Sequence, residues 1–147
     1  MKELRSKGVK EINVIQDEII EEFEAFDEWL ERYQLIIEYG KELKPMPESD
    51  KTDKNLIDGC QSKVWFTARM ENGRLLFTGD SDAILVKGIV AMLLSVLNDH
   101  TPDEILKAEL YFIDRIGLRE HLSPTRSNGV VAMLKQLKLY ALAYKSV

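Results

Sequence analysis

One short β-hairpin is the feature that most restricts how this chain can fold. Every second residue is apolar over 64–70, Asn72-Gly73 is a preferred two-residue hairpin turn, and Leu75 and Phe77 continue the pattern on the return strand. A single hairpin is only marginally stable in water. Helices from the flanking segments are therefore needed to cover at least one of its faces.

The segment before the hairpin predicts two helices. Apolar residues recur at spacings of three and four over residues 12–26, which is typical of one apolar helix face. Asp27 is placed to cap a second helix, whose aromatic and branched residues face inward, and Gly40 is expected to end or loosen that helix. Residues 41–54 contain two prolines and are predicted to be irregular.

The segment after the hairpin predicts three more helices. Ser81 is a candidate N-cap for a helix that is apolar on most sides, with Asp82 in its first turn, and we expect that helix to be central and buried. Residues 101–104 form a capping box that starts a short helix ending near Ala108. The dipeptide Ser123-Pro124 starts the last helix.

The order of the elements is helices, strands, helices, which favours an α+β fold over a parallel α/β sheet. With 147 residues, the chain is expected to form a single domain over 1–147. Half of residues 1–8 are charged, and this segment is expected to be frayed.

The composition excludes several classes of protein. The net charge is −5 and no stripe of Lys and Arg is present, which argues against a nucleic-acid partner. No apolar run approaches the roughly 20 residues that span a membrane. The charged stretch over residues 1–7 is not followed by the apolar core of a signal peptide, so none is expected. A single cysteine allows no internal disulfide, which fits a cytoplasmic location. One cysteine and two histidines also argue against a structural zinc site.

The only cysteine, Cys60, lies in a stretch typical of a loop. Its neighbours Asp58, Gly59, Gln61 and Ser62 are polar or glycine. Free cysteines are commonly buried and inert, so the surrounding residues decide between the two interpretations. They favour a reactive group at a loop tip that is carried by a rigid sheet.

The stretch Asp58-Gly59-Cys60-Gln61-Ser62-Lys63-Val64-Trp65 resembles the signature of the SufE family. This family comprises sulfur-acceptor proteins that work with cysteine desulfurases in iron–sulfur cluster assembly. Three further blocks, at residues 36–43, 79–88 and 121–129, agree with the family pattern in the same order. The resemblance covers the chain from Trp29 to its C-terminus.

The resemblance implies a fold and a function. The fold would be a small antiparallel sheet of about three strands packed against helices, with a third short strand near residues 55–57. Cys60 would accept a persulfide sulfur from a cysteine desulfurase and relay it to an iron–sulfur scaffold complex. The pyridoxal phosphate belongs to the desulfurase, so we expect this chain to bind no cofactor. It would act as a monomer or weak homodimer, accessory to the desulfurase, and whether it is itself an enzyme stays open.

Five residues are candidates for the site. Cys60 is the catalytic thiol, and the partner-binding candidates are Gly59, Gln61, Asp82 and Arg126. The sequence also allows other interpretations: Asp82 could be a helix-capping carboxylate, and Arg126 a surface helix charge.

The sequence also predicts roles for several residues outside the candidate site. Asp80 is interpreted mainly as a capping carboxylate, His121 as a structural histidine, and Lys87 as a residue at the solvent edge of its helix. Lys54 or Lys63 could lower the pKa of the thiol.

Two alternatives to a sulfur carrier remain: a scaffold-like iron–sulfur protein, and a helical interaction protein with a structural cysteine. A scaffold normally needs several cysteines to hold iron, which counts against the first alternative. For a sulfur carrier, we expect Cys60 to rest largely buried against apolar side chains, with a raised pKa.

Overall fold

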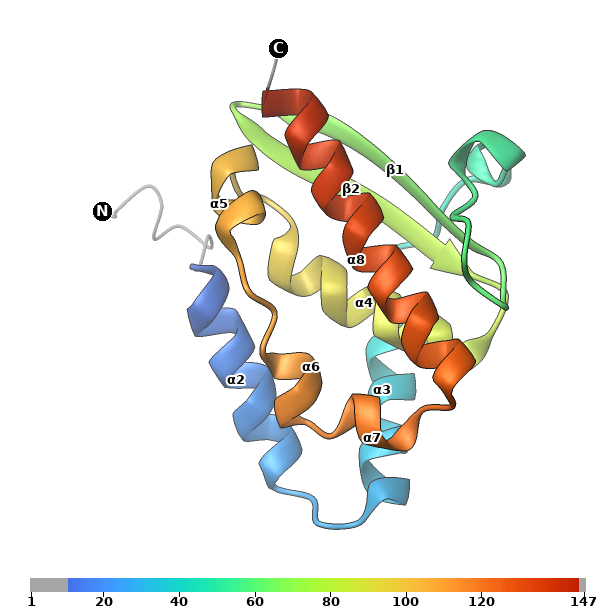
Figure 1. The fold of residues 1–147 in the computed structure, drawn as a ribbon, viewed down its shortest axis with the longest axis vertical. Helices are drawn as coiled ribbons and strands as arrows, with labels where there is room; N and C mark the ends of the chain where they lie inside the picture. Colours follow the sequence, from blue (N-terminus) through green and yellow to red (C-terminus); the bar gives the residue numbers. More distant parts are fainter. Residues whose placement is uncertain (1–10, 146–147) are drawn as a thin grey trace.

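The computed structural model describes residues 11–145, so the expectation for residues 1–8 lies outside this range. Helices precede and follow one hairpin, which confirms the α+β class (Figure 1). The elements before the hairpin are α2 (Ile12–Glu24), α3 (Trp29–Lys41) and the 3-10 turns η1 (Glu48–Asp50) and η2 (Asp53–Asn55). The hairpin consists of β1 (Val64–Glu71) and β2 (Arg74–Ser81). The later helices are α4 (Ile84–Leu97), α5 (Pro102–Lys107), α6 (Phe112–Arg115), α7 (Leu118–His121) and α8 (Pro124–Lys145).

The hairpin forms as its turn predicts. Asn72 and Gly73 have φ angles of 53° and 80°, the left-handed pair that a two-residue turn of this kind requires. The third strand is reduced to one antiparallel bridge between Leu56 and Trp65, so the sheet of the described residues has two strands. The 3-10 turn η2 directly precedes Leu56 and keeps the chain from extending alongside β1.

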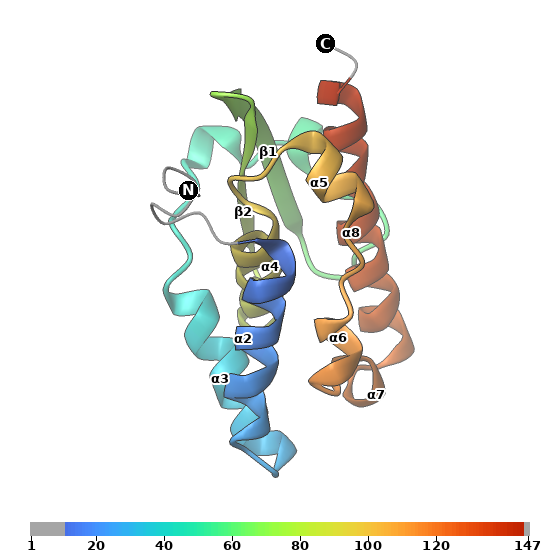
Figure 2. The ribbon, with the colours of Figure 1, turned by 90° about the vertical axis from the view of Figure 1, so that its left-hand side faces the viewer.

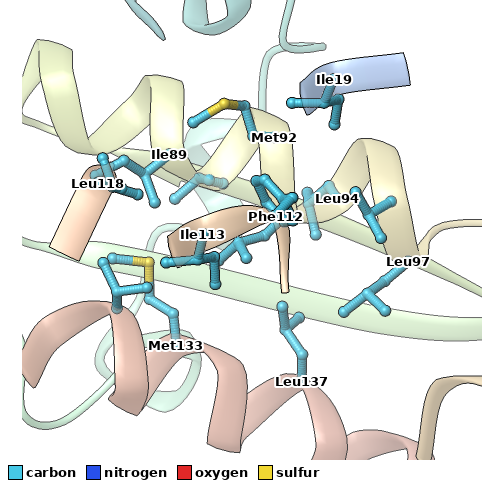
Figure 3. Packing of buried hydrophobic residues seen from close by; sticks show 14 of the residues in the cluster. Ile19, Ile89, Met92, Leu94, Leu97, Phe112, Ile113, Leu118, Met133 and Leu137 are labelled. Atoms are coloured by element: carbon cyan, nitrogen blue, oxygen red, sulfur yellow. The ribbon is translucent and has the colours of Figure 1, made fainter. Parts of the chain in front are cut away.

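Helix α4 is the centre of the core, as its all-round apolar character predicts. Eleven of its 14 residues are buried. Figure 3 shows Met92 of α4 near Ile19 of α2 and Phe112 of α6, with Leu137 of α8 on the other side of the cluster. The burial of these apolar side chains stabilises the packing of helices against the hairpin, which is only marginally stable alone.

Two glycines bring α3 and α4 into close contact. A Cβ atom on Gly88 would lie 2.1 Å from the carbonyl oxygen of Ile36, and one on Gly40 would lie 3.0 Å from the backbone nitrogen of Gly88. The predicted end of the helix at Gly40 is one residue early, because α3 ends at Lys41. Gly40 additionally permits the close crossing of the two helices.

Two predicted helix caps are also wrong, whereas a third is confirmed. Glu28, and not Asp27, is the N-cap of α3. Ala83 is the N-cap of α4, because Ser81 remains in β2 and its hydroxyl donates a hydrogen bond to the Lys63 carbonyl (2.8 Å). The capping box at Thr101 forms as predicted.

The hairpin lies between α8 and the segment over residues 42–55 (Figure 2). On the α8 side, the ring of Tyr140 contacts Phe77, and its hydroxyl donates to the Phe66 carbonyl (3.3 Å). On the other side, the ammonium of Lys51 lies 5.7 Å from the ring centroid of Trp65. Within residues 11–145, no helix is both long enough and apolar enough to cross a bilayer.

We expect Gly88→Ala to destabilise the protein by about 2 kcal/mol or more, because the methyl group would collide with backbone atoms of α3. Helix propensity alone would favour alanine by about 1 kcal/mol, so the collision determines the sign. The measurement is urea unfolding. Ser95→Ala, at an exposed position of the same helix, is the control and should stay within about 0.5 kcal/mol of the wild type. A Gly88→Ala variant as stable as the wild type would contradict the close crossing.

Candidate functional site

Cys60 lies at the tip of a loop that joins two stems at one end of the hairpin. The leading stem is residues 55–57, where the Ile57 N–H donates to the Val64 carbonyl (2.8 Å). The trailing stem is residues 63–65, which begins β1. Gly59 has a φ of +91°, a left-handed conformation that glycine adopts without strain, and this angle turns the chain at the tip.

The trailing stem is held by hydrogen bonds from the end of β2. The Lys63 N–H donates to the carboxylate of Asp82 (3.0 Å), and the Asp82 N–H donates to the Lys63 carbonyl (3.2 Å). The prediction that Asp82 occupies the first turn of α4 is wrong, because α4 begins after it. Its exposed carboxylate anchors the Cys60 loop instead.

Below the tip lies a small apolar hollow. Its floor comes from α4 and α8 and includes Val86, Ile89 and Met133. The Cys60 Sγ–H donates to the carbonyl oxygen of Gly129 (3.6 Å), which is the sulfur's hydrogen-bond partner in the described part of the chain. The hollow has a volume of about 10 Å³, close to the smallest space that holds one water molecule.

The thiol is partly buried and packs against the hydrophobic core, which agrees with the prediction of a side chain sheltered by apolar residues. Burial raises the pKa of the Cys60 thiol, as expected for a sulfur beside apolar groups. Lys54 and Lys63 are both exposed, and desolvation is the effect that moves the pKa. The resting thiol is thus less ionised at neutral pH than an ordinary cysteine.

The structure brings most of the predicted partner-binding residues to this loop. Gln61 and Arg126 line the hollow together with Cys60. A Cβ atom on Gly59 would lie 3.2 Å from the Cβ of Ala132, so the glycine also lets the tip approach α8. Their role in binding a partner stays a prediction.

His121 has a structural role, as expected. Its ring stacks on Trp29, with centroids 4.2 Å apart, and its Nδ1 lies 2.9 Å from the Gly117 carbonyl oxygen. The stack joins α7 to α3, and α8 begins shortly after α7.

Asp80 is not a capping carboxylate, contrary to the main interpretation of the sequence. It is buried in β2, and its carboxylate forms ion pairs with Lys51 (3.3 Å) and Lys87 (3.5 Å). Lys87, expected at the solvent edge of its helix, is therefore also paired with a buried carboxylate. Sequence reasoning missed Lys51 altogether, because it lies in an irregular segment and its partner is far along the chain.

The chemistry of the site is that of a single nucleophilic sulfur. Across residues 11–145, no group of three or more His, Cys, Asp or Glu side chains is arranged to hold a metal ion. The Cys60 sulfur contacts a backbone carbonyl and apolar groups. The arrangement can hold a thiol, or a derivative of it, at a loop tip that another molecule can reach.

Comparison with known proteins identifies the family. Residues 17–141 match the family model SufE, described as an Fe-S metabolism associated domain. An uncharacterised SufE-like protein of Synechocystis sp. is 41% identical over 127 residues, which cover 86% of this chain and 80% of that protein. A second uncharacterised SufE-like protein, from Rhizobium meliloti, is also 41% identical over 127 residues, covering 83% of this chain and 91% of its own length.

A solved structure shares the fold. The solution structure of a hypothetical protein from Thermus thermophilus aligns with a TM-score of 0.75 and 23% identity, covering 90% of this chain and 97% of that one. That structure shows the fold alone, whereas the family model and the two relatives, which each cover most of this chain, show its family. The chain belongs to the SufE family, and its role is in iron–sulfur metabolism.

Proposed function

We propose that the protein accepts sulfur from a cysteine desulfurase at Cys60 and relays it to an iron–sulfur cluster assembly scaffold. The observation that carries this proposal is the placement of the only cysteine, half-buried at the tip of a loop that is anchored to the hairpin at both stems. Membership of a family associated with iron–sulfur metabolism supports it.

The transfer is a balanced exchange between two sulfur centres. The Cys60 thiolate attacks the outer sulfur of the donor's cysteine persulfide, and a new S–S bond forms on Cys60. The S–S bond of the donor breaks, and the donor cysteine leaves as a thiolate. One thiolate and one persulfide are present before and after the step, so it requires no external oxidant or reductant.

The size of the hollow favours a protein as the sulfur donor. A volume of about 10 Å³ is far too small for a metabolite. The raised pKa leaves little thiolate in the resting state, and the sulfur's partner is a carbonyl rather than a base. Activation of Cys60 is therefore assigned to the docked desulfurase, whose site would draw the loop outward.

The protein itself needs no cofactor for this reaction, because a thiol suffices as the acceptor. The pyridoxal phosphate that releases sulfur from cysteine belongs to the desulfurase. Asp82 is hydrogen-bonded to the trailing stem, and Arg126 lines the hollow. Both are proposed to contact the partner there together with Gly59 and Gln61.

Cys60→Ser should abolish stimulation of the desulfurase, because a hydroxyl cannot accept the persulfide sulfur. The measurement is the rate of alanine and sulfide release by the desulfurase with and without each variant. The serine is nearly isosteric, so the free energy of unfolding should change by less than about 1 kcal/mol. Stimulation by a folded Cys60→Ser variant equal to that of the wild type would refute sulfur acceptance at this residue.

Two substitutions at Asp82 separate docking from anchoring of the loop. Asp82→Asn retains an oxygen that can accept the Lys63 N–H, so only the charge is lost, whereas Asp82→Ala loses both. If the charge contacts the partner, Asp82→Asn should raise the protein concentration for half-maximal stimulation roughly threefold to tenfold. Alkylation of Cys60 by iodoacetamide should be unchanged in Asp82→Asn and faster in Asp82→Ala. Unchanged stimulation by Asp82→Asn would leave Asp82 with the anchoring role alone.

A further inference from the structure

A buried carboxylate lies at the base of the Cys60 loop, on the strand that pairs with the trailing stem. The side chain of Asp80 is only 7% exposed, and Asp80 pairs with Trp65 of the trailing stem in the β-ladder. The carboxylate accepts the Ser81 N–H (2.8 Å) and forms ion pairs with Lys51 and Lys87. Isolated buried charges are costly, so this carboxylate depends on its cationic partners.

Lys51 connects this carboxylate to the leading stem. Its ammonium lies 3.3 Å from Asp80 and 2.9 Å from Glu48, and it also lies over the ring of Trp65. The side chain of Lys51 is 23% exposed, so solvent screens the contact less than it screens a surface pair. Residue 51 lies between η1 and η2, and the Asn55 amide donates to the Asp50 carbonyl (2.8 Å), which makes this short stretch compact up to the stem.

The residues next to Asp80 connect it to the trailing stem. The hydroxyl of Ser81 donates a hydrogen bond to the Lys63 carbonyl (2.8 Å), and the carboxylate of Asp82 accepts one from the Lys63 N–H. Asp80 is therefore linked to both stems: indirectly to the leading one, through Lys51 and the Asn55–Asp50 hydrogen bond, and to the trailing one through its chain neighbours. By contrast, the tip of the loop has a weaker hold, a 3.6 Å contact between the Cys60 sulfur and the Gly129 carbonyl.

We propose that Lys51 and Asp80 are positioning residues for Cys60: their ion pair fixes the leading stem against the hairpin and so holds the thiol in its half-buried place. Without the Lys51 ammonium, the leading stem opens more often, and the weakly held tip opens with it. Lys87 binds the same carboxylate but belongs to α4, which the core fixes independently. It supports Asp80 without holding the loop.

The inference draws its biological meaning from the proposed function, but it can be tested without a desulfurase. Cys60 is the only cysteine of the sequence, so alkylation of the protein by iodoacetamide reports on this one thiol. The rate is measured from about pH 6 to about pH 10, which brackets the ordinary thiol pKa of about 8.5. The variants are Lys51→Met, Lys51→Arg and Lys87→Met.

Lys51→Met should be alkylated roughly threefold to tenfold faster than the wild type at neutral pH, because local opening exposes the sulfur. Its thiol pKa should fall toward the ordinary value, since burial is what raises it. Lys51→Arg keeps the charge and should restore the wild-type rate and pH profile. Hydrogen exchange at residues 55–57 should accelerate in Lys51→Met alone.

Lys87→Met is the matched control, because it removes an ion pair to the same carboxylate. It should lower the thermal midpoint by an amount comparable to Lys51→Met, yet leave the alkylation of Cys60 unchanged. Wild-type alkylation in Lys51→Met, or equal acceleration in both methionine variants, would overturn the positioning role. If the thiol of Lys51→Met reacts faster as stated but the wild type takes up no sulfur from a desulfurase, the proposed function fails and the positioning role stands.

Discussion

The burial of α4 is the constraint on which the rest of the structure depends. A two-stranded hairpin does not persist in water unless a helix covers it, and α4 packs against β2, α2, α3 and α8 at once. The approach of α3 is so close that glycine is required at position 88. This packing gives the hairpin a fixed frame, from which the Cys60 loop can extend without distorting the core.

The reactive loop is firmly held at its base and weakly held at its tip. Backbone and carboxylate hydrogen bonds fix Ile57 and Lys63, whereas Cys60 has one long contact to a carbonyl and apolar surroundings. A partner could therefore displace the tip with little loss of free energy, while the two stems stay attached to the hairpin. The raised pKa of Cys60 follows from the same geometry, because the resting tip sits against α4 and α8. Under the proposed function, such a thiol would react slowly until a partner docks.

The sequence predicted features that depend on neighbouring residues and misjudged those that depend on distant ones. Asn72-Gly73 and the capping box at Thr101 are local signals, and both formed as expected. Ser81 and Asp80 were assigned to the start of a helix, but they form a hydrogen bond with Lys63 and an ion pair with Lys51 instead. Gly40 does lie near the end of its helix, but its close contact with Gly88 could not be predicted from its neighbours. The loop around Cys60 could be predicted from its polar neighbours. Burial of the thiol was also expected, but the helices that bury it, α4 and α8, could not be predicted from its sequence neighbours.

Mass spectrometry of the wild-type protein after incubation with a cysteine desulfurase and free cysteine tests the central claim most directly. The account predicts an added mass of one or more sulfur atoms, removable by a reductant and located by peptide mapping on Cys60. An unmodified protein, recovered from a desulfurase that is itself carrying a persulfide, would contradict the claim that this chain accepts sulfur.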